Sequence, residues 1–243
     1  MTTVLEVTGL RKSFGRLTAV DGIDFQLSRG EVLGVAGPNG AGKSTLINLL
    51  SRVPFAPDSG TVLLDGVSLA RASARAVCRR GLARTFQAES AFDTLSAYDN
   101  VRVAAVYGRP GRASHDEVRR RVLDALDLVG LRDTGDVPAS ELPLIAKKKL
   151  MIASALVTEP KVLCLDEPAS GLIEPEQREL GAVMTELRGR GTAIIVVEHV
   201  LPLLRAVADR LIIMATGKIL AEGEPAAVLE HPDVIAAYIG SEA

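Results

Sequence analysis

The stretch at residues 37–45, GPNGAGKST, decides the fold class. It fits the pattern G-x-x-x-x-G-K-[S/T], follows the short apolar run at residues 32–36 and precedes leucines at helical spacing. Glycines let the backbone curl so that several N–H groups point at phosphate oxygens, and the N-terminus of the following helix adds partial positive charge. A chance glycine-rich turn is the alternative, but both flanks fit a phosphate loop. The stretch therefore predicts a phosphate-binding loop between a strand and a helix.

The residue types in this loop predict roles for individual side chains. Lys43 would neutralise the β and γ phosphates of a nucleotide, and the Ser44 hydroxyl would coordinate Mg²⁺. The expected nucleotide-binding set is Gly37, Pro38, Asn39, Gly40, Ala41, Gly42, Lys43, Ser44 and Thr45.

Polar residues also end two later apolar strands. In VLCLDEP, Asp166 is placed to hold Mg²⁺ and Glu167 to polarise a water molecule. In IIVVEHV, Glu198 and His199 end a strand that we expect beside the one carrying Asp166, so His199 is a candidate contact for the γ-phosphate. An acidic pair after a strand is usually only solvated. The phosphate loop upstream favours the functional interpretation.

Two further residues are weaker candidates. Gln87, in RTFQ, ends another candidate strand, and its amide would bind Mg²⁺ or hold the attacking water. Phe14, in SFG, is expected on a loop before the phosphate loop, where it would stack on a base. Because aromatic residues make up only 3% of the chain, a loop aromatic is notable, although core packing is the alternative.

Composition excludes several classes of protein. With 243 residues, 47% of them hydrophobic, the chain can bury a full core and is not disordered. A net charge of −2 argues against a nucleic-acid-binding protein, and two cysteines without metal spacing argue against a disulfide framework or a structural zinc site. No signal-peptide layout and no apolar run near the roughly 20 residues of a membrane span occur, so we expect a cytosolic protein.

Hydrophobic periodicity predicts an α/β fold. Residues before the phosphate loop are β-rich, and residues 88–140 are helical, with a helix through Val118, Val122 and Leu126 that Gly130 ends. Beyond it, helices and apolar strands alternate, which is typical of a mostly parallel sheet covered on both faces.

Taken in order, the phosphate loop, the glutamine after TF, the strand ending in DEP and the strand ending in EH resemble the ATP-binding cassette (ABC) ATPases. The likeness spans essentially the whole chain. Through LARTFQ, DEPASGL, VVEHV, DRLIIMATGKILAEGEP and HPDVIAAYIG, it is closest to the ATPase subunits of branched-chain amino acid importers. The resemblance implies a single P-loop NTPase domain over residues 1–243. Residues 1–87 and 156–243 would form a RecA-like core with an antiparallel β subdomain, and residues 88–155 an inserted helical subdomain.

The resemblance also implies roles. Phe14 would stack on adenine, Gln87 would sense Mg²⁺ and water beside the membrane subunit, and Asp166 would bind Mg²⁺. Glu167 would be the catalytic glutamate and His199 the switch histidine, with Lys43 on the phosphates. ATP and Mg²⁺ are the implied ligands.

The implied assembly is a head-to-tail pair of ATPase subunits on two permease subunits at the cytoplasmic face of the inner membrane, served by a substrate-binding protein and without nucleic acid. Three alternatives stay open: an exporter ATPase, for example for lipid, a soluble ABC protein acting on ribosomes or DNA, and a non-hydrolysing regulatory subunit.

One segment departs from the family. The slot of the L-S-G-G-Q signature holds LPLIA, Leu142 to Ala146, and Pro143 has neither the serine hydroxyl nor a backbone N–H. Ile173 stands where Asp or Asn is usual. We expect a helix from about Ala146, with lysines 147–149 facing solvent; the alternative is that Lys147 supplies charge to the opposite ATP. A second, different ATPase subunit with an ordinary signature is therefore the preferred partner, and a homodimer is the alternative.

Overall fold

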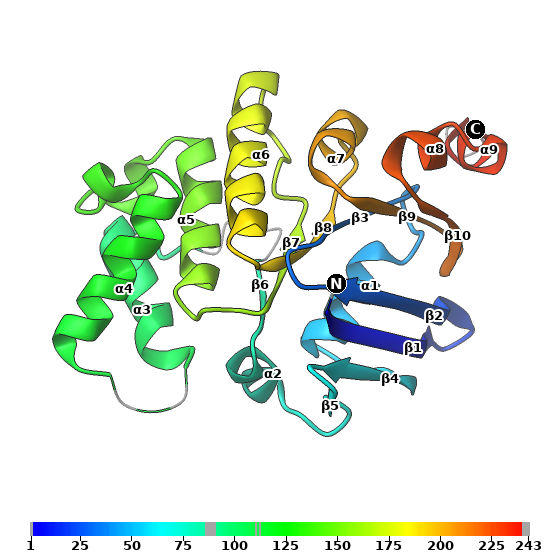
Figure 1. The fold of residues 1–243 in the computed structure, drawn as a ribbon, viewed down its shortest axis with the longest axis horizontal. Coiled ribbons are helices and arrows are strands. Elements are labelled where there is room, and N and C mark those ends of the chain that lie inside the picture. The colour runs from blue at the N-terminus through cyan, green and yellow to red at the C-terminus, as the bar shows by residue number, and fades with distance from the viewer. Residues whose placement is uncertain (1, 86–90, 110, 112, 240–243) are drawn as a thin grey trace.

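Two β-sheets and a set of helices make up the fold in the computed structural model, which describes residues 2–85, 91–109, 111 and 113–239 (Figure 1). The larger sheet has six strands in the order β10-β9-β3-β8-β7-β6. All neighbours in it are parallel except β10, which runs antiparallel to β9. Its strands are β3 (Val32–Ala36), β6 (Leu82–Arg84), β7 (Val162–Asp166), β8 (Ala193–Val197), β9 (Arg210–Ala215) and β10 (Lys218–Gly223).

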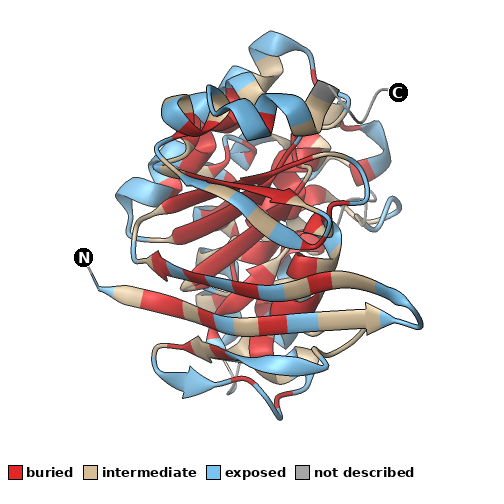
Figure 2. Ribbon diagram, turned by 90° about the vertical axis from the view of Figure 1, so that its right-hand side faces the viewer, coloured by how far each residue is buried: buried red, intermediate tan, exposed pale blue. Residues whose placement is uncertain are grey.

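The smaller sheet is antiparallel, with the order β2-β1-β4-β5. Its strands are β1 (Thr3–Phe14), β2 (Leu17–Ser28), β4 (Ser59–Leu64) and β5 (Val67–Ser68). Burial alternates strictly over residues 22–27 of β2, as expected of a strand with one face on the core and one in solvent, and β1 also mixes buried and exposed residues along its length (Figure 2). Helix α1 (Lys43–Ser51) packs its leucines with residues of both sheets in one core cluster, and α2 (Ala74–Arg80) adds Val77 to it.

Helices cover the other face of the larger sheet and form a separate group at one side of the molecule (Figure 1). Ser96 and Ser114 cap the helices that follow them by accepting the N–H of Asp99 and of Glu117. The group at the side holds α3 (Ala97–Tyr107), α4 (His115–Leu128), the 3₁₀ turns Arg132–Thr134 and Ala139–Glu141, and α5 (Leu144–Leu156). The other helices are α6 (Glu174–Gly189), α7 (Leu201–Val207), α8 (Pro225–Leu229) and α9 (Pro232–Ile239).

Strands β3, β7 and β8 are buried along their whole length, because each face packs on a different core. Leu163 and Leu165 of β7 face the helical core, whereas Val162 and Cys164 face the core shared with α1. The continuous apolar runs in the sequence follow from this burial on two sides. The predicted α/β class and mostly parallel sheet are confirmed. None of the helices described here is long and apolar enough to cross a membrane.

The predicted helical stripe is also confirmed, since Val118, Val122 and Leu126 are all buried on α4. The helix ends at Leu128, and Gly130 follows with φ +71°, a conformation that favours glycine. The division of the chain at residues 87/88 and 155/156 into a core and a helical subdomain stays a prediction, and its first boundary lies outside the described residues.

Candidate functional site

Three loops meet at one edge of the larger sheet because β3, β7 and β8 are parallel neighbours and end together. The glycine-rich loop follows β3, Asp166 ends β7, and Glu198 with His199 follows β8 (Figure 1). The carboxyl edge of a parallel sheet is where open α/β folds bind ligands. The topology therefore brings the predicted groups together, and β7 lies beside β8 as expected.

The glycines of the loop are required by close backbone contacts. A Cβ on Gly37 would lie 2.0 Å from the Met214 carbonyl oxygen, and a Cβ on Gly42 would lie 2.1 Å from the Ala19 carbonyl oxygen. Both residues also have positive φ, of 143° and 100°, which L side chains rarely adopt. Any larger residue at either position would force the loop open.

Lys43 closes the loop over its own backbone. Its ammonium group donates to the carbonyl oxygens of Gly37 at 2.7 Å and Pro38 at 3.0 Å. Burial lowers the pKa of Lys43, while the charges of Glu167 and Asp166 raise it. The lysine thus lies in the field of both carboxylates, at the centre of a loop suited to phosphate.

Asp166 is the most enclosed carboxylate at this edge after Glu198. Its side chain is 2% exposed, and its Oδ2 accepts from Arg84 Nη2 at 2.9 Å. Burial raises the pKa of Asp166, and the positive charge of Arg84 opposes that rise. Its Oδ1 is buried and has no hydrogen-bond partner within the part of the chain described.

These features fit a Mg²⁺ ion, which binds through one or two protein oxygens together with nucleotide phosphates and water. The unsatisfied Oδ1 of Asp166 would supply one oxygen to such an ion, and the exposed Ser44 at the start of α1 would supply a hydroxyl. No cluster of three or more His, Cys, Asp or Glu side chains suited to a metal occurs among the described residues.

Glu167 adopts a backbone conformation that non-glycine residues rarely use, with φ +48°. Its N–H donates to the Val197 carbonyl of β8 at 2.9 Å, which ties the turn after β7 to the neighbouring strand. His199, on the loop after β8, keeps 60% of its side chain exposed. The charge of Glu167 acts on Lys43 of the loop at residues 37–45, and His199 lies on the loop after the neighbouring strand β8.

The two weaker candidates have different outcomes. Phe14 was expected on a loop, and this is wrong: it is the last residue of β1, because the long hairpin β1–β2 extends further than its residue types indicate. The residue is 44% exposed, and its ring meets Phe55 edge-on with centroids 5.0 Å apart and lies 5.4 Å from Lys12 Nζ. Gln87 lies outside the described residues.

The departing segment LPLIA packs into its own chain. Pro143 is exposed and is the N-cap of α5, so the helix begins at Leu144 and the expected start near Ala146 is wrong. Leu142 is buried, and Leu144 packs on the helical core and against Gly171. The apolar residues of this segment thus pack within their own chain, on both sides of the helix start.

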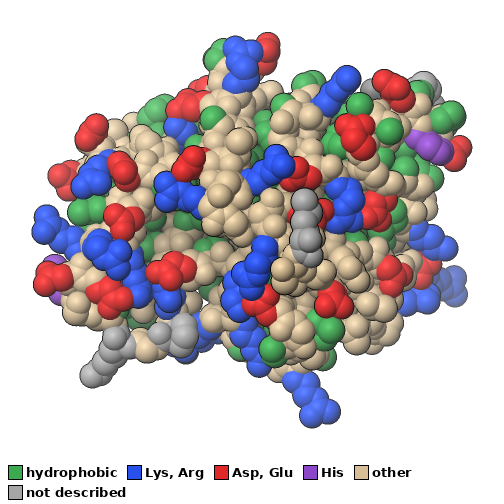
Figure 3. Space-filling model, viewed as in Figure 1, with side chains coloured by type: hydrophobic (Ala, Val, Ile, Leu, Met, Phe, Trp, Pro, Cys, Tyr) green, Lys and Arg blue, Asp and Glu red, His purple; other side chains and the backbone are tan. Residues whose placement is uncertain are grey.

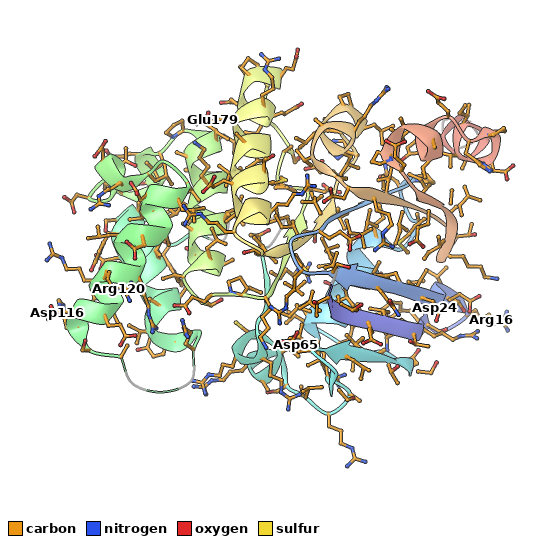
Figure 4. The ribbon with its side chains drawn as sticks, in the orientation of Figure 1. Arg16, Asp24, Asp65, Asp116, Arg120 and Glu179 are labelled. Atoms are coloured by element: carbon orange, nitrogen blue, oxygen red, sulfur yellow. The ribbon has the colours of Figure 1, made fainter. Side chains whose placement is uncertain are left out.

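The expectation that all three lysines face solvent is also wrong. Lys148 and Lys149 are each 7% exposed, because α3, α4, α6 and β6 all contact α5. Their aliphatic stems bury, as long basic side chains often do. Lys149 forms an ion pair with Glu179, which lies on the side of α6 that faces α5 (Figure 4).

Two polar residues of this site carried no sequence-based assignment. Arg84 is a basic residue in the apolar run before TFQ, and in the structure it bridges α1 and β7 by donating to Asn48 Oδ1 at 2.5 Å and to Asp166. Glu198 precedes His199 and is completely buried. A charged residue at the end of an apolar strand, as Arg84 is, or directly after one, as Glu198 is, is the signal that identifies each of them.

A groove of about 300 Å³ lies beside this site, between α3, α5 and the end of β6. Phe92, Tyr107 and Met151 give it a largely apolar lining, and Arg84 forms part of its wall. Phe92 and Tyr107 remain 55% and 68% exposed. By contrast, basic and acidic side chains are interspersed over the face shown in Figure 3.

Comparison with known proteins agrees with this arrangement. Residues 20–170 match the family described as ABC transporter, and residues 218–243 match the family described as branched-chain amino acid ATP-binding cassette transporter. The chain is 34% identical to the high-affinity branched-chain amino acid transport ATP-binding protein LivG of Escherichia coli, with 98% of each chain covered. It is 32% identical to the corresponding protein BraF of Pseudomonas aeruginosa, also over 98% of each.

Solved structures give the same result. An ATP-binding cassette of an ABC transporter in its ADP conformation superposes with a TM-score of 0.90, at 27% identity and over 99% of this chain and 100% of that one. The protein cbiO1 of Clostridium perfringens superposes with a TM-score of 0.85, at 30% identity and over 97% and 94% of the two chains. The resemblance expected from the motifs is confirmed: the chain belongs to the ABC transporter ATP-binding family.

Proposed function

We propose that this chain is the ATP-hydrolysing subunit of an importer for branched-chain amino acids or a related small solute. ATP hydrolysis is supported by one observation: Lys43, Asp166 and Glu167 lie together at one edge of the sheet. The substrate class is supported by the match of residues 218–243 and by the printed functions of LivG and BraF.

In this proposal the loop at residues 37–45 wraps the phosphates of ATP with its backbone N–H groups. Lys43 exchanges its hydrogen bonds to Gly37 and Pro38 for bonds to phosphate oxygens, which are better acceptors for a cation. Phe14 stacks on the adenine with the exposed side of its ring.

Glu167 accepts a proton from the attacking water, and His199 contacts the γ-phosphate. General base catalysis of this kind contributes roughly 10²- to 10⁴-fold to a rate. Ser44, Gln87 and Asp166 would hold Mg²⁺, which when bound neutralises charge on the phosphates. Arg84 fixes the Asp166 carboxylate through Oδ2 and leaves Oδ1 for the metal side.

The groove lined by Phe92, Tyr107 and Met151 is the proposed dock for a short helix of a permease subunit. Exposed apolar surface of this kind marks interaction sites. Docking there would hold the chain at the cytoplasmic face of the inner membrane and put the permease against Arg84, which contacts Asp166.

The altered signature supports a heteromeric pair of ATPase subunits. Pro143 offers no N–H or hydroxyl to an ATP held by a partner, and the loss of one charge-assisted hydrogen bond costs about 1.5–3 kcal/mol. A partner with an ordinary signature would complete the site built on Lys43 and Glu167. A purified homodimer should then hydrolyse ATP at least tenfold more slowly than the heteromeric complex, and equal rates would contradict this pairing.

Transport itself is tested in liposomes that contain the permease subunits and both ATPase subunits, with binding protein and labelled leucine outside and ATP inside. Leucine should accumulate only with ATP and the binding protein; ATP-driven export or no leucine movement would contradict the proposal.

The proposed dock is tested separately, since Tyr107→Glu should prevent assembly with the permease. Val106→Glu is the matched control, because Val106 is exposed on the same helix but does not line the groove.

A further inference from the structure

Glu198 is a completely buried carboxylate at the carboxyl edge of the sheet, with 0% of its surface exposed. Its Oε1 accepts the N–H of Ala169 at 2.6 Å, and its Oε2 accepts the N–H of His199 at 3.1 Å. Burial raises the pKa of Glu198, whereas these N–H groups and that of Val200 oppose the rise. A buried acidic side chain without hydrogen-bond partners would strongly destabilise the fold, so the backbone N–H groups around Glu198 are what allow it to be buried.

The two oxygens of Glu198 hold two different loops. Ala169 belongs to the turn that follows β7 and begins with Glu167, and His199 belongs to the loop that follows β8. The turn also carries the positive φ of 48° at Glu167, which is costly for a non-glycine residue and persists only where neighbours fix it. Val197 fixes its first N–H through a bond of 2.9 Å, and Glu198 fixes Ala169.

We propose that Glu198 is a positioning residue for ATP hydrolysis. By holding both loops, it fixes the Glu167 carboxylate relative to the His199 side chain, so that the two groups address one water molecule and one γ-phosphate. This inference rests on the roles proposed above for Glu167 and His199. Within the described part of the chain, no hydrogen bond or ion pair joins the Glu198 side chain to the loop at residues 37–45, so its removal should impair turnover and spare nucleotide binding.

Glu198→Gln tests this with little change of shape. A carboxamide has one acceptor oxygen, so either Ala169 or His199 loses its acceptor and faces an N–H₂ group instead. A displacement of about 1 Å at a reacting group can cost roughly 100-fold in rate. We expect kcat of the transporter complex to fall about 10- to 100-fold while the KM for ATP changes less than about threefold.

A double-mutant cycle separates positioning from general stability. ATP turnover and the binding of a fluorescent ATP analogue are measured for the wild-type complex, Glu167→Gln, Glu198→Gln and the double variant. If Glu198 acts through Glu167, its substitution adds less than about twofold to the loss in the Glu167→Gln background. The control is Glu31→Gln, at a carboxylate that accepts the N–H of Ser28 at the far end of the sheet and should leave kcat unchanged.

The outcomes are distinct. The inference is overturned if Glu198→Gln keeps kcat within threefold of wild type, if its loss is as large in the Glu167→Gln background as alone, or if nucleotide binding falls in proportion to kcat. If instead Glu167→Gln leaves turnover intact, the proposed function fails. Should Glu198→Gln not fold, Glu198→Asp replaces it: the shorter side chain keeps the acidic charge but withdraws from Ala169, and the same split between kcat and KM is expected.

Discussion

The substitution Arg84→Met should strongly lower the stability of the folded protein, although Arg84 has no expected contact with ATP. The side chains of Arg84 and Asp166 are 9% and 2% exposed, so their ion pair is well shielded from water. The same guanidinium donates to Asn48 Oδ1 at 2.5 Å and more weakly to Ser51 Oγ at 3.4 Å, both on α1. Methionine fills a similar volume but removes every one of these bonds.

The expected loss follows from the charge that stays behind. Breaking a buried ion pair by removing one partner costs about 3–5 kcal/mol, because the other charge is left uncompensated. For a chain of this size each kcal/mol lowers the melting temperature by about 2–4 °C, so a fall of roughly 6–20 °C is expected. Arg84→Lys keeps the positive charge, but its single ammonium group cannot bridge two partners as the planar guanidinium does, so its loss of stability should be intermediate.

Far-UV circular dichroism is the suitable assay, because the chain has no tryptophan and only three tyrosines. Melting curves of the nucleotide-free protein are compared for Arg84→Met, Asp166→Asn and the double variant. The double variant should be more stable than the sum of the two single losses predicts, since it buries no unpaired charge. A melting temperature of Arg84→Met within 2 °C of wild type, or additive losses, would refute the reasoning.

Three further predictions use matched changes. Asp65→Asn should lower stability by up to about 1 kcal/mol at pH 7. Because the hydrogen bond from Lys161 lowers the pKa of Asp65, this stabilisation is present above the unfolded-state pKa and is lost as the pH falls through the folded-state pKa. The urea midpoints of variant and wild type should therefore converge below about pH 4. Gly37→Ala should abolish binding of ATP, whereas Gly40→Ala, which also has a positive φ (79°) but nothing within 4 Å of its Cβ, should retain binding in the same titration. Lys149→Met should change stability by less than about 1 kcal/mol and leave ATP turnover intact, since the ion pair of Lys149 is with a half-exposed carboxylate; a large loss of turnover would contradict this structural role of Lys149.

The fold and the order of the site motifs were predictable because they are local. The loop at residues 37–45 fixes its conformation through glycines within a few positions, and the strands before Asp166 and His199 are continuous apolar runs. Parallel strands bring their carboxyl ends to one edge of the sheet. Motifs that are far apart in the sequence can therefore be predicted to meet at this edge even when the order of the strands is not known.

The pairing of Arg84 with Asp166 was not predictable in this way. The two residues lie on β6 and β7, 82 positions apart, and their contact depends on the order in which the strands enter the sheet. Glu198 was visible as part of VVEHV, but its burial and its bond to Ala169 depend on the turn after the neighbouring strand. Both contacts depend on the tertiary structure, and no periodic pattern in the sequence indicates them.

The lysines of α5 misled the sequence interpretation for a related reason. Charged residues in a row usually mark a solvated face. Here α5 is enclosed by neighbours on several sides, so Lys148 and Lys149 are buried although their side chains are charged. A helix that is largely apolar around its circumference belongs to a core, and the run at residues 150–156 carries that signal.

The central claim is that Glu167 drives ATP hydrolysis at a site completed by the loop at residues 37–45. It is tested most directly by phosphate release from saturating ATP and Mg²⁺ in the assembled complex, with wild-type chain and with Glu167→Gln, alongside binding of the nucleotide. We predict that release falls by at least about 100-fold while ATP stays bound. Release within threefold of wild type would contradict the claim.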